Sequence, residues 1–280
     1  MPPVVAIVAP GAMGSGVSAR LREQGVTVLT SLAGRSAASA ERARQAGMRA
    51  VSDTELLAAD LLLSIVPPGD AIAFAERYAP LLKAAPRKPL FVDCNAVSPE
   101  TALRIGEVLA AVQCPYVDAS IIGLPPVPGK PGPRIYASGD DAPRFAVLAQ
   151  YGLDIRVLKG PIGAASALKM SYAGCTKGLI ALGSAMMLAA ERAGASEALR
   201  AELAESQPHL LGWLSRSVPT MYAKAYRFVG EMEEIADFVG RDRPEHQFFT
   251  GAAGLYTRLA EDNRTGQRET SALTRFLKPE

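Results

Sequence analysis

The sequence predicts an α/β domain with a doubly wound, mainly parallel sheet, followed by an all-α domain. Up to about residue 160, short apolar runs of strand length alternate with segments of helix length, as in a parallel sheet covered by helices on both faces. Beyond that point the strand-like runs stop and long segments with helical periodicity follow. We therefore expect domains at residues 1–160 and 161–280.

Composition and charge favour a soluble protein of two domains. The chain has 280 residues, of which 49% are hydrophobic, and this is enough for two cores. Its net charge is +2 with both signs interspersed, so neither a nucleic-acid partner nor a membrane surface is expected. The three cysteines lack metal-ligand or CxxC spacing, which favours a reducing compartment and no metal site. We expect a cytoplasmic protein.

The first element is a strand at residues 4–8, because Val4 to Val8 form a short apolar run typical of a strand buried on both faces. A turn with the sequence A-P-G-A-M-G follows. We expect a helix over 15–24, ended by Gly25, and a second strand at 26–30. Strand, turn, helix and strand together form a βαβ unit.

The glycine turn predicts a dinucleotide-binding site. Gly11 lacks a Cβ and allows the backbone to approach a pyrophosphate, and Gly14 lets the helix pack closely on its strand. The helix start offers N–H groups and a positive dipole end to the phosphates. We expect cofactor contacts from Gly11, Ala12, Met13 and Gly14, although Ala9 replaces the first glycine of the full G-x-G-x-x-G fingerprint. A plain structural turn is the alternative.

The segment after the second strand predicts NADP rather than NAD as the cofactor. NAD enzymes usually place an acid there to bind the ribose, whereas NADP enzymes place a cation near the 2′-phosphate. This segment has no acid but contains Arg35, which can hold a phosphate bidentately, with Ser31 or Ser36 as a hydroxyl donor. Alternatively, Arg35 begins a solvated helix that also contains Arg42 and Arg44.

The alternation of strands and helices continues to about residue 160. We expect helices at 70–82 and 99–112 and strands at 60–66, 89–93, 116–118, 134–138 and 155–158. Ligands bind at the carboxyl ends of the strands in such sheets. Val66, Pro67 and Asn95, which follow two of these strands, should therefore border the ribose and the nicotinamide.

One long helix at 164–194 is expected to open the second domain. It contains no proline and would be about 45 Å long at 1.5 Å per residue, so we expect it to pack against a second subunit as well. Further helices are expected at 196–206, 208–217, 219–239, 246–262 and 269–276. The predicted partners are a small-molecule substrate and a second copy of the chain, in a homodimer formed through the helical domain.

Four motifs together resemble the β-hydroxyacid dehydrogenase superfamily, which includes 6-phosphogluconate and 3-hydroxyisobutyrate dehydrogenases and to which imine reductases are related. The motifs are A-P-G-A-M-G, V-D-C-N-A-V-S-P, D-A-S-I-I-G and G-P-I-G-A-A-S-A-L-K, in the family's order within residues 3–190. The resemblance implies a Rossmann domain, a nicotinamide cofactor and a helical second domain. The C-terminal part resembles a less characterised, phosphogluconate-dehydrogenase-like subgroup.

The resemblance implies that Lys169 is the catalytic acid/base, because the family places such a lysine on the first turns of the long helix. Hydride transfer from a hydroxyl-bearing carbon leaves a proton that must be taken up, and the reverse reaction must supply one. An amine can exchange this proton if its surroundings lower its pKa. A solvated helix lysine is the alternative, although the neighbouring residues Ala165, Ala167, Leu168 and Met170 are small or apolar.

Several residues depart from the family pattern near the expected substrate. Tyr172 stands near the place of the family's asparagine, one turn after the lysine, and is either a hydrogen-bonding or proton-relaying group or a packed aromatic. Ser120 and Gly123 are expected near the substrate. The family's Ser-Gly-Gly is replaced by Ile122, Gly123 and Leu124, so the usual hydroxyl contact to a carboxylate is missing.

The family's later Lys-Asp pair also lacks a clear counterpart. The corresponding helix contains Glu231, Glu233 and Glu234, which indicate either a less anionic substrate or a charged, solvated face. The sequence thus predicts an NADP-dependent oxidoreductase that moves hydride between nicotinamide and a small, β-hydroxyacid-like substrate. Two alternatives remain: an imine reductase with the same fold, and a catalytically silent NADP-binding protein.

Overall fold

The computed structural model describes residues 1–278. The chain divides into two compact units, one ending at Lys169 and the other beginning at Met170. This division lies within helix α7 (Ala164–Arg192), later in the sequence than the boundary expected after residue 160. By length and composition α7 could cross a membrane, but the core helix of a soluble protein passes the same test, and 44% of its most apolar window is buried.

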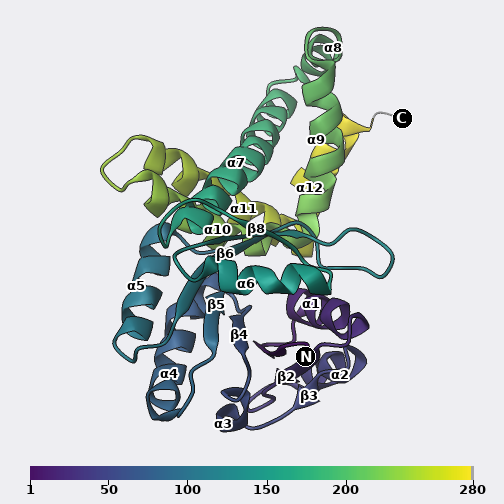
Figure 1. The fold of residues 1–280 in the computed structure, drawn as a ribbon. Helices are drawn as coiled ribbons and strands as arrows, with labels where there is room; N and C mark the ends of the chain where they lie inside the picture. Colours follow the sequence, from purple (N-terminus) through teal and green to yellow (C-terminus); the bar gives the residue numbers. More distant parts are fainter. Residues whose placement is uncertain (279–280) are drawn as a thin grey trace. The chain divides into compact units, whose positions relative to one another are not determined.

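One sheet of eight strands forms the centre of the first unit within the described residues (Figure 1). The strands are β1 (Val4–Val8), β2 (Thr27–Thr30), β3 (Arg49–Ala50), β4 (Leu61–Ser64), β5 (Leu90–Asp93), β6 (Tyr116–Ile122), β7 (Arg134–Ser138) and β8 (Asp154–Val157). Their order is β3-β2-β1-β4-β5-β6-β7-β8, and all neighbours are parallel except β6 and β7. The predicted doubly wound, mainly parallel sheet is confirmed.

Helices cover both faces of this sheet. They are α1 (Ala12–Glu23), α2 (Ala37–Gln45), α3 (Asp53–Leu56), η1 (Pro68–Asp70), α4 (Ala71–Ala84), α5 (Pro99–Ala110), α6 (Ala142–Phe145), η2 (Ala146–Tyr151) and the first residues of α7. Successive strand residues point to opposite faces, so Ile7 and Leu63 lie in one apolar cluster and Ala6 and Leu62 in another. Burial on both faces explains why these strands read as continuous apolar runs.

Several short elements of the first unit escaped the sequence analysis, among them β3, α3, α6 and η2. Strand β3 has only two residues, both exposed, and therefore no apolar run. Helices α3 and α6 are single turns. Helix α3 did carry a signal, because Ser52 and Glu55 form a capping box.

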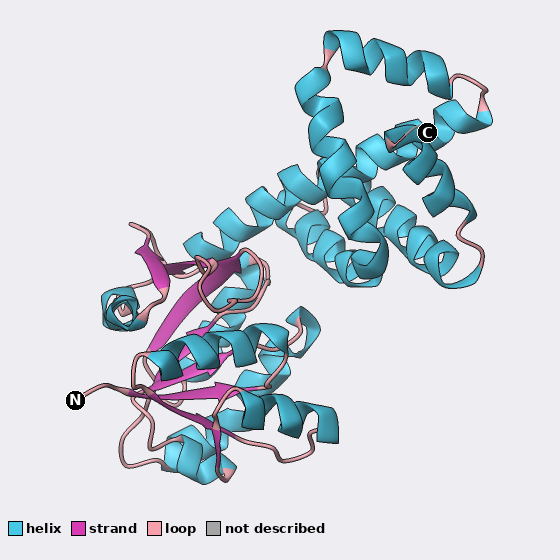
Figure 2. Cartoon of the chain, turned by 90° about the vertical axis from the view of Figure 1, so that its right-hand side faces the viewer, coloured by secondary structure: helices cyan, strands magenta, loops and turns pink. Residues whose placement is uncertain are grey.

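The second unit is entirely helical in the residues that the structure describes (Figure 2). Its elements are the rest of α7, α8 (Ser196–Ser206), α9 (Pro208–Met221), η3 (Tyr222–Lys224), α10 (Ala225–Val239), α11 (Glu245–Thr265) and α12 (Arg268–Leu277). The predicted helix start at residue 219 is wrong, because α9 continues through Pro219 to Met221. Val218 and Met221 are fully buried, and this packing holds the helix together past the proline.

Candidate functional site

The turn between β1 and α1 leaves an open space at Gly11. A Cβ added at Gly14 would lie 2.8 Å from the carbonyl oxygen of Ala9, so packing within the chain explains that glycine. A Cβ at Gly11 would meet no atom within 4 Å, and its φ of −71° suits any residue. Neither packing nor conformation requires the glycine at position 11, and the space beside it is open to a ligand.

Ala9 takes the conformation that the missing first glycine would adopt easily. Its φ is 68°, in the left-handed region, where a Cβ is unfavourable. The chain thus keeps the backbone shape of the glycine turn although the residue has changed. The incomplete fingerprint in the sequence therefore does not indicate a different turn.

The hydroxyls of the two serines after β2 form hydrogen bonds within the first unit. The Ser36 hydroxyl caps α2 by accepting a hydrogen bond from the Ser39 N–H (3.3 Å) and donates to the Ser39 hydroxyl (3.2 Å). The buried Ser31 hydroxyl accepts from the Ala33 N–H (3.4 Å). The Arg35 side chain is exposed. Arg35 thus has an exposed cation, whereas the hydroxyls of Ser31 and Ser36 already take part in hydrogen bonds within the chain.

Arg42 was not selected from the sequence, yet it contacts the glycine turn. Its Nε donates to the carbonyl oxygen of Pro10 (2.9 Å), and its Nη2 donates to the Ser39 hydroxyl (2.9 Å). The guanidinium therefore joins α2 to the turn that precedes α1. The two contacts correct the idea that Arg42 lies on a merely solvated helix face.

Asn95 links the carboxyl ends of β4 and β5. Its Oδ1 accepts from the Val66 N–H (2.7 Å), and its Nδ2 donates to the Ser64 hydroxyl (2.8 Å) and to the Asp93 carboxyl group. The side chain is buried, and its amide is engaged inside the unit. Asn95 thus holds the backbone at Val66, and the following Pro67 is exposed.

Asp118 on β6 holds the start of α7. Its Oδ2 accepts from the Gly163 N–H (2.9 Å), the Ser166 N–H (3.1 Å) and the Ser138 hydroxyl (3.0 Å). Its Oδ1 accepts from the Ser166 hydroxyl (2.7 Å). The four donors satisfy a fully buried carboxylate and cap a helix that begins in the core.

Asp93 is the register neighbour of Asp118 on the adjacent strand. Complete burial, reinforced by the negative charge of Asp118, raises the pKa of Asp93 to about 8. At neutral pH Asp93 is therefore mostly protonated. The protonated Asp93 thus lies beside Asp118, the residue that holds the start of α7.

Lys169 reaches the end of the same strand. Its Nζ donates to the carbonyl oxygen of Ile121 (2.9 Å), and the side chain is half-buried. Strand β6 therefore holds α7 at two points, at its first turn through Asp118 and one turn later through Ile121. The amine lies at the carboxyl end of β6, the edge at which ligands bind in such sheets.

The other predicted substrate and catalytic residues have different surroundings. Ser120 is fully buried, and its hydroxyl has no hydrogen-bond partner among the described residues. Gly123 has a φ of 136°, and a Cβ there would lie 3.0 Å from Pro133, so the β6–β7 connection itself requires this glycine. Tyr172 belongs to the second unit, where its side chain is 50% exposed. Its part in proton transfer stays a prediction.

Glu231 is engaged in the second unit and is not part of a merely solvated face. Its carboxylate forms an ion pair with Lys177 on α7, and both side chains are mostly buried. The Lys177 ammonium also lies 4.5 Å from the ring centroid of Phe228. The backbone carbonyl of Lys177 accepts a hydrogen bond from the Tyr256 hydroxyl (2.6 Å). The charge of Glu231 is thus balanced within its own unit, whereas Glu233 is exposed.

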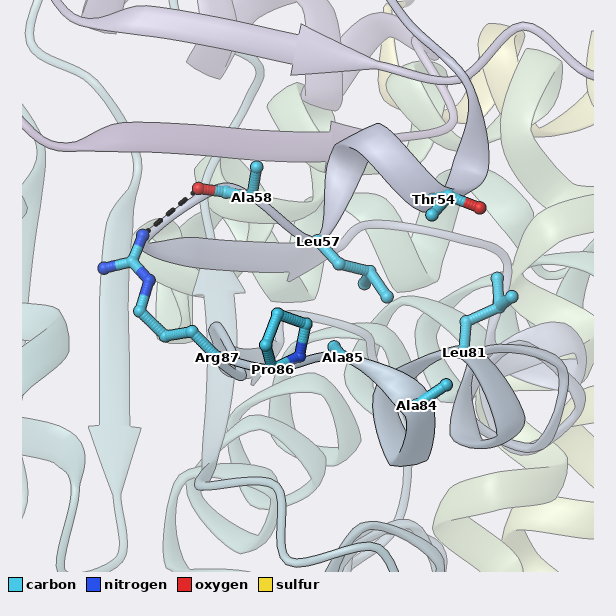
Figure 3. A pocket seen from close by; sticks show the side chains of 8 residues that line it. All are labelled: Thr54, Leu57, Ala58, Leu81, Ala84, Ala85, Pro86 and Arg87. Carbon is cyan, nitrogen blue, oxygen red and sulfur yellow. Dashed lines mark hydrogen bonds between the residues drawn. The ribbon is translucent and has the colours of Figure 1, made fainter.

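A cavity of about 430 Å³ lies near the amino ends of β4 and β5 (Figure 3). It is lined by Thr54, Leu57, Ala58, Leu81, Ala84, Ala85, Pro86 and Arg87. Arg87 donates to the carbonyl oxygen of Ala58 (3.2 Å) and pairs with Asp60. These residues precede β4 and β5, so the cavity is remote from the carboxyl ends of the strands. Within residues 1–278 no group of three His, Cys, Asp or Glu could hold a metal ion.

Two family models match this chain. The NAD binding domain of 6-phosphogluconate dehydrogenase matches residues 4–143, and a domain of unknown function, DUF1932, matches residues 190–259. The solved structure of the conserved protein MTH1747, described as similar to 3-hydroxyacid dehydrogenases, is 31% identical with a TM-score of 0.72. The match covers 93% of this chain and 97% of that one.

More distant structures share the fold. A 3-hydroxyisobutyrate dehydrogenase from Mycobacterium tuberculosis, solved with L-serine, is 19% identical with a TM-score of 0.74 over 98% of each chain. An imine reductase from Myxococcus stipitatus in complex with NADP⁺ is 18% identical with a TM-score of 0.56, over 99% of this chain and 100% of that one. A variant of that reductase was solved with NAD⁺.

Proposed function

This chain belongs to the β-hydroxyacid dehydrogenase superfamily, and from that membership we propose that it is an NADP-dependent oxidoreductase acting on a small hydroxy substrate. The observation that carries the proposal is the open space at Gly11, at the start of α1. A pyrophosphate fits there because the first N–H groups of a helix lack partners within the helix and attract anions. Bound nicotinamide would supply or accept the hydride.

Residues around the turn would hold the rest of the cofactor. Arg35 is exposed and can bind the 2′-phosphate, while Val66 and Pro67, which follow β4, would border the ribose and the nicotinamide. Asn95 fixes Val66 through its backbone N–H and so sets the position of that border. The three cysteines are free, which suits the reducing cytoplasm in which we place the protein.

Lys169 would exchange the proton of the reaction. During oxidation, its unprotonated Nζ takes the proton of the substrate hydroxyl while the carbon of that group loses hydride and becomes a carbonyl. During reduction, the ammonium form returns the proton to the oxygen. The carbonyl oxygen of Ile121 holds the amine in place at 2.9 Å without supplying a competing charge.

The proposal is tested by following NADPH and NADP⁺ with a panel of hydroxy acids, aldehydes and cyclic imines. Turnover of hydroxy acids or aldehydes supports it. Turnover of cyclic imines alone would identify the imine reductase alternative, in which hydride adds to the carbon and a proton to the nitrogen of a C=N bond. Binding of NADPH without turnover of any of these substrates would support the other alternative, a catalytically silent NADP-binding protein.

Replacing Gly11 by valine should abolish most of the cofactor affinity without disturbing the fold. The added side chain would fill the space at the start of α1, so we expect the Kd for NADPH to rise by about tenfold or more. The free energy of unfolding should fall by about 1 kcal/mol, because a Cβ at this N-cap meets no atom and valine is a poor N-cap residue. Titration calorimetry and urea unfolding measure the two quantities.

Gly14→Ala provides the contrast to Gly11→Val. Its Cβ would lie 2.8 Å from the Ala9 carbonyl oxygen, so the variant should lose about 1–3 kcal/mol of stability through overpacking. If Gly11→Val bound NADPH as tightly as the wild type, the space at Gly11 would not be the pyrophosphate site.

The partner that we propose for α7 is a second copy of the chain, in a homodimer. Tyr172, Cys175, Leu179, Leu182 and Met186 are exposed on the part of α7 that belongs to the second unit. Their spacings of three and four residues alternate, which places them on one side of the helix as in the seam of a coiled coil. A repeated apolar seam on a long helix fits the same seam on another copy.

Leu182→Glu should convert the dimer to a monomer, because a charge in the seam would be buried without a partner. Sedimentation equilibrium would measure the change in mass. Leu103→Glu, at a 50% exposed leucine on α5, is the matched control and should leave the mass unchanged. A wild-type chain that sediments as a monomer would contradict the proposed dimer.

A further inference from the structure

We propose that Arg42 is a second arginine that binds the 2′-phosphate of NADP. Because Arg42 also contacts the glycine turn, it would couple the preference for NADP to the shape of that turn. The inference rests on the proposed NADP-dependent function. It adds a specificity-determining residue that lies on α2, beyond the loop in which sequence patterns place the phosphate-binding cation.

The contacts of Arg42 leave part of its guanidinium available. Its Nε is bound to the Pro10 carbonyl oxygen and one Nη2 hydrogen to the Ser39 hydroxyl, both at 2.9 Å. A guanidinium has five N–H donors, and Nη1 of Arg42 has no hydrogen bond to residues 1–278. Two donors thus fix the group in position while others remain to bind an anion.

The charge of Arg42 is not neutralised within the chain. No ion pair among residues 1–278 includes it, whereas Arg44 on the same helix makes a two-bond ion pair with Glu41. Asp53, which is hydrogen-bonded to Ser31 after β2, is also paired with Arg77 and accepts from the Tyr78 hydroxyl. The nearby acids are therefore already engaged with other partners.

The position of Arg42 matches the place where the phosphate would arrive. Its two contacts lie in the glycine turn after β1 and in the first turn of α2, and the loop carrying Arg35 connects β2 to that same helix. The 2′-phosphate of a dinucleotide lies beyond β2, between these elements. Arg35 from the loop and Arg42 from the helix would then bind it from two sides.

NADPH and NADH provide the test, because they differ only in the 2′-phosphate. We expect Arg42→Met to raise the Kd for NADPH by about 10- to 100-fold, as for a lost charge-assisted hydrogen bond, and the Kd for NADH by less than about twofold. Arg42→Lys, which keeps the charge but not the fork of donors, should give a smaller rise for NADPH. Arg44→Met, at the ion-paired arginine on the same helix, should change neither value.

The outcomes separate this inference from the proposed function. If Arg42→Met weakened NADPH and NADH equally, Arg42 would only hold the turn against α2, and the inference would be overturned while the proposed function stood. The same holds if neither Kd changed. A wild-type chain that bound neither dinucleotide, or that bound NADH more tightly, would remove the inference together with the NADP-dependent function.

Discussion

Replacing Lys169 by methionine is expected to lower kcat by about 10²- to 10⁴-fold, the usual contribution of a positioned acid/base. Methionine retains most of the apolar stem and removes the amine that donates to the Ile121 carbonyl oxygen. The Kd for NADPH should remain unchanged, because the glycine turn and the β2–α2 loop are not altered. The measurement is kcat with the best substrate of the panel, accompanied by NADPH titration.

Lys159→Met is the matched control for Lys169→Met. Lys159 is exposed and lies just before α7, so its loss should leave kcat within about twofold of the wild type. A Lys169→Met enzyme with normal kcat would exclude this amine as the acid/base. A parallel loss of kcat and of NADPH affinity would instead indicate that Lys169 supports the fold of the site.

Local sequence patterns were sufficient to predict the sheet and the glycine turn. The strands of a parallel sheet are apolar on both faces, so each reads as a short run that needs no knowledge of its neighbours. The turn after β1 is likewise local, and Ala9 adopts the left-handed conformation expected of the missing glycine. The very short β3 could not be found in this way, because its two exposed residues carry no pattern.

The contacts that organise the site could not be predicted, because they join residues far apart in the chain. Arg42 binds Pro10 across 32 residues, and Asp118 binds Ser166 across 48. Glu231, for which the sequence offered two explanations, pairs with Lys177, which lies 54 residues away in the sequence. Such hydrogen bonds depend on how the elements pack, and a charged or polar residue in the sequence does not reveal its partner.

Replacing either of the two buried aspartates by asparagine should change the free energy of unfolding, but with opposite signs at the two positions. Asp118→Asn is expected to destabilise the protein by about 2–4 kcal/mol, because an amide cannot accept the four hydrogen bonds that the carboxylate receives from Gly163, Ser166 and Ser138. Urea unfolding at pH 8 would measure this loss. Unchanged stability would show that Asp118 does not hold the start of α7.

Asp93→Asn should stabilise the protein at the same pH. The pKa of Asp93 is about 8 in the folded state against an ordinary value of 3.8, so between these pH values the folded chain keeps a proton that the unfolded chain has lost. The free energy of unfolding of the wild type therefore falls as the pH rises, by at most about 1.4 kcal/mol per pH unit from this group. Asparagine is neutral in both states and removes this decline.

The advantage of Asp93→Asn over the wild type should thus be small near pH 4 and grow up to about pH 8. Urea unfolding of both proteins at several pH values within this range measures the difference directly, since all other titrating groups are shared. A variant that is less stable than the wild type at pH 8 would mean that Asp93 is ionised in the folded core. In that case the two strands would hold two adjacent buried negative charges beneath α7, which the single set of donors around Asp118 could not satisfy.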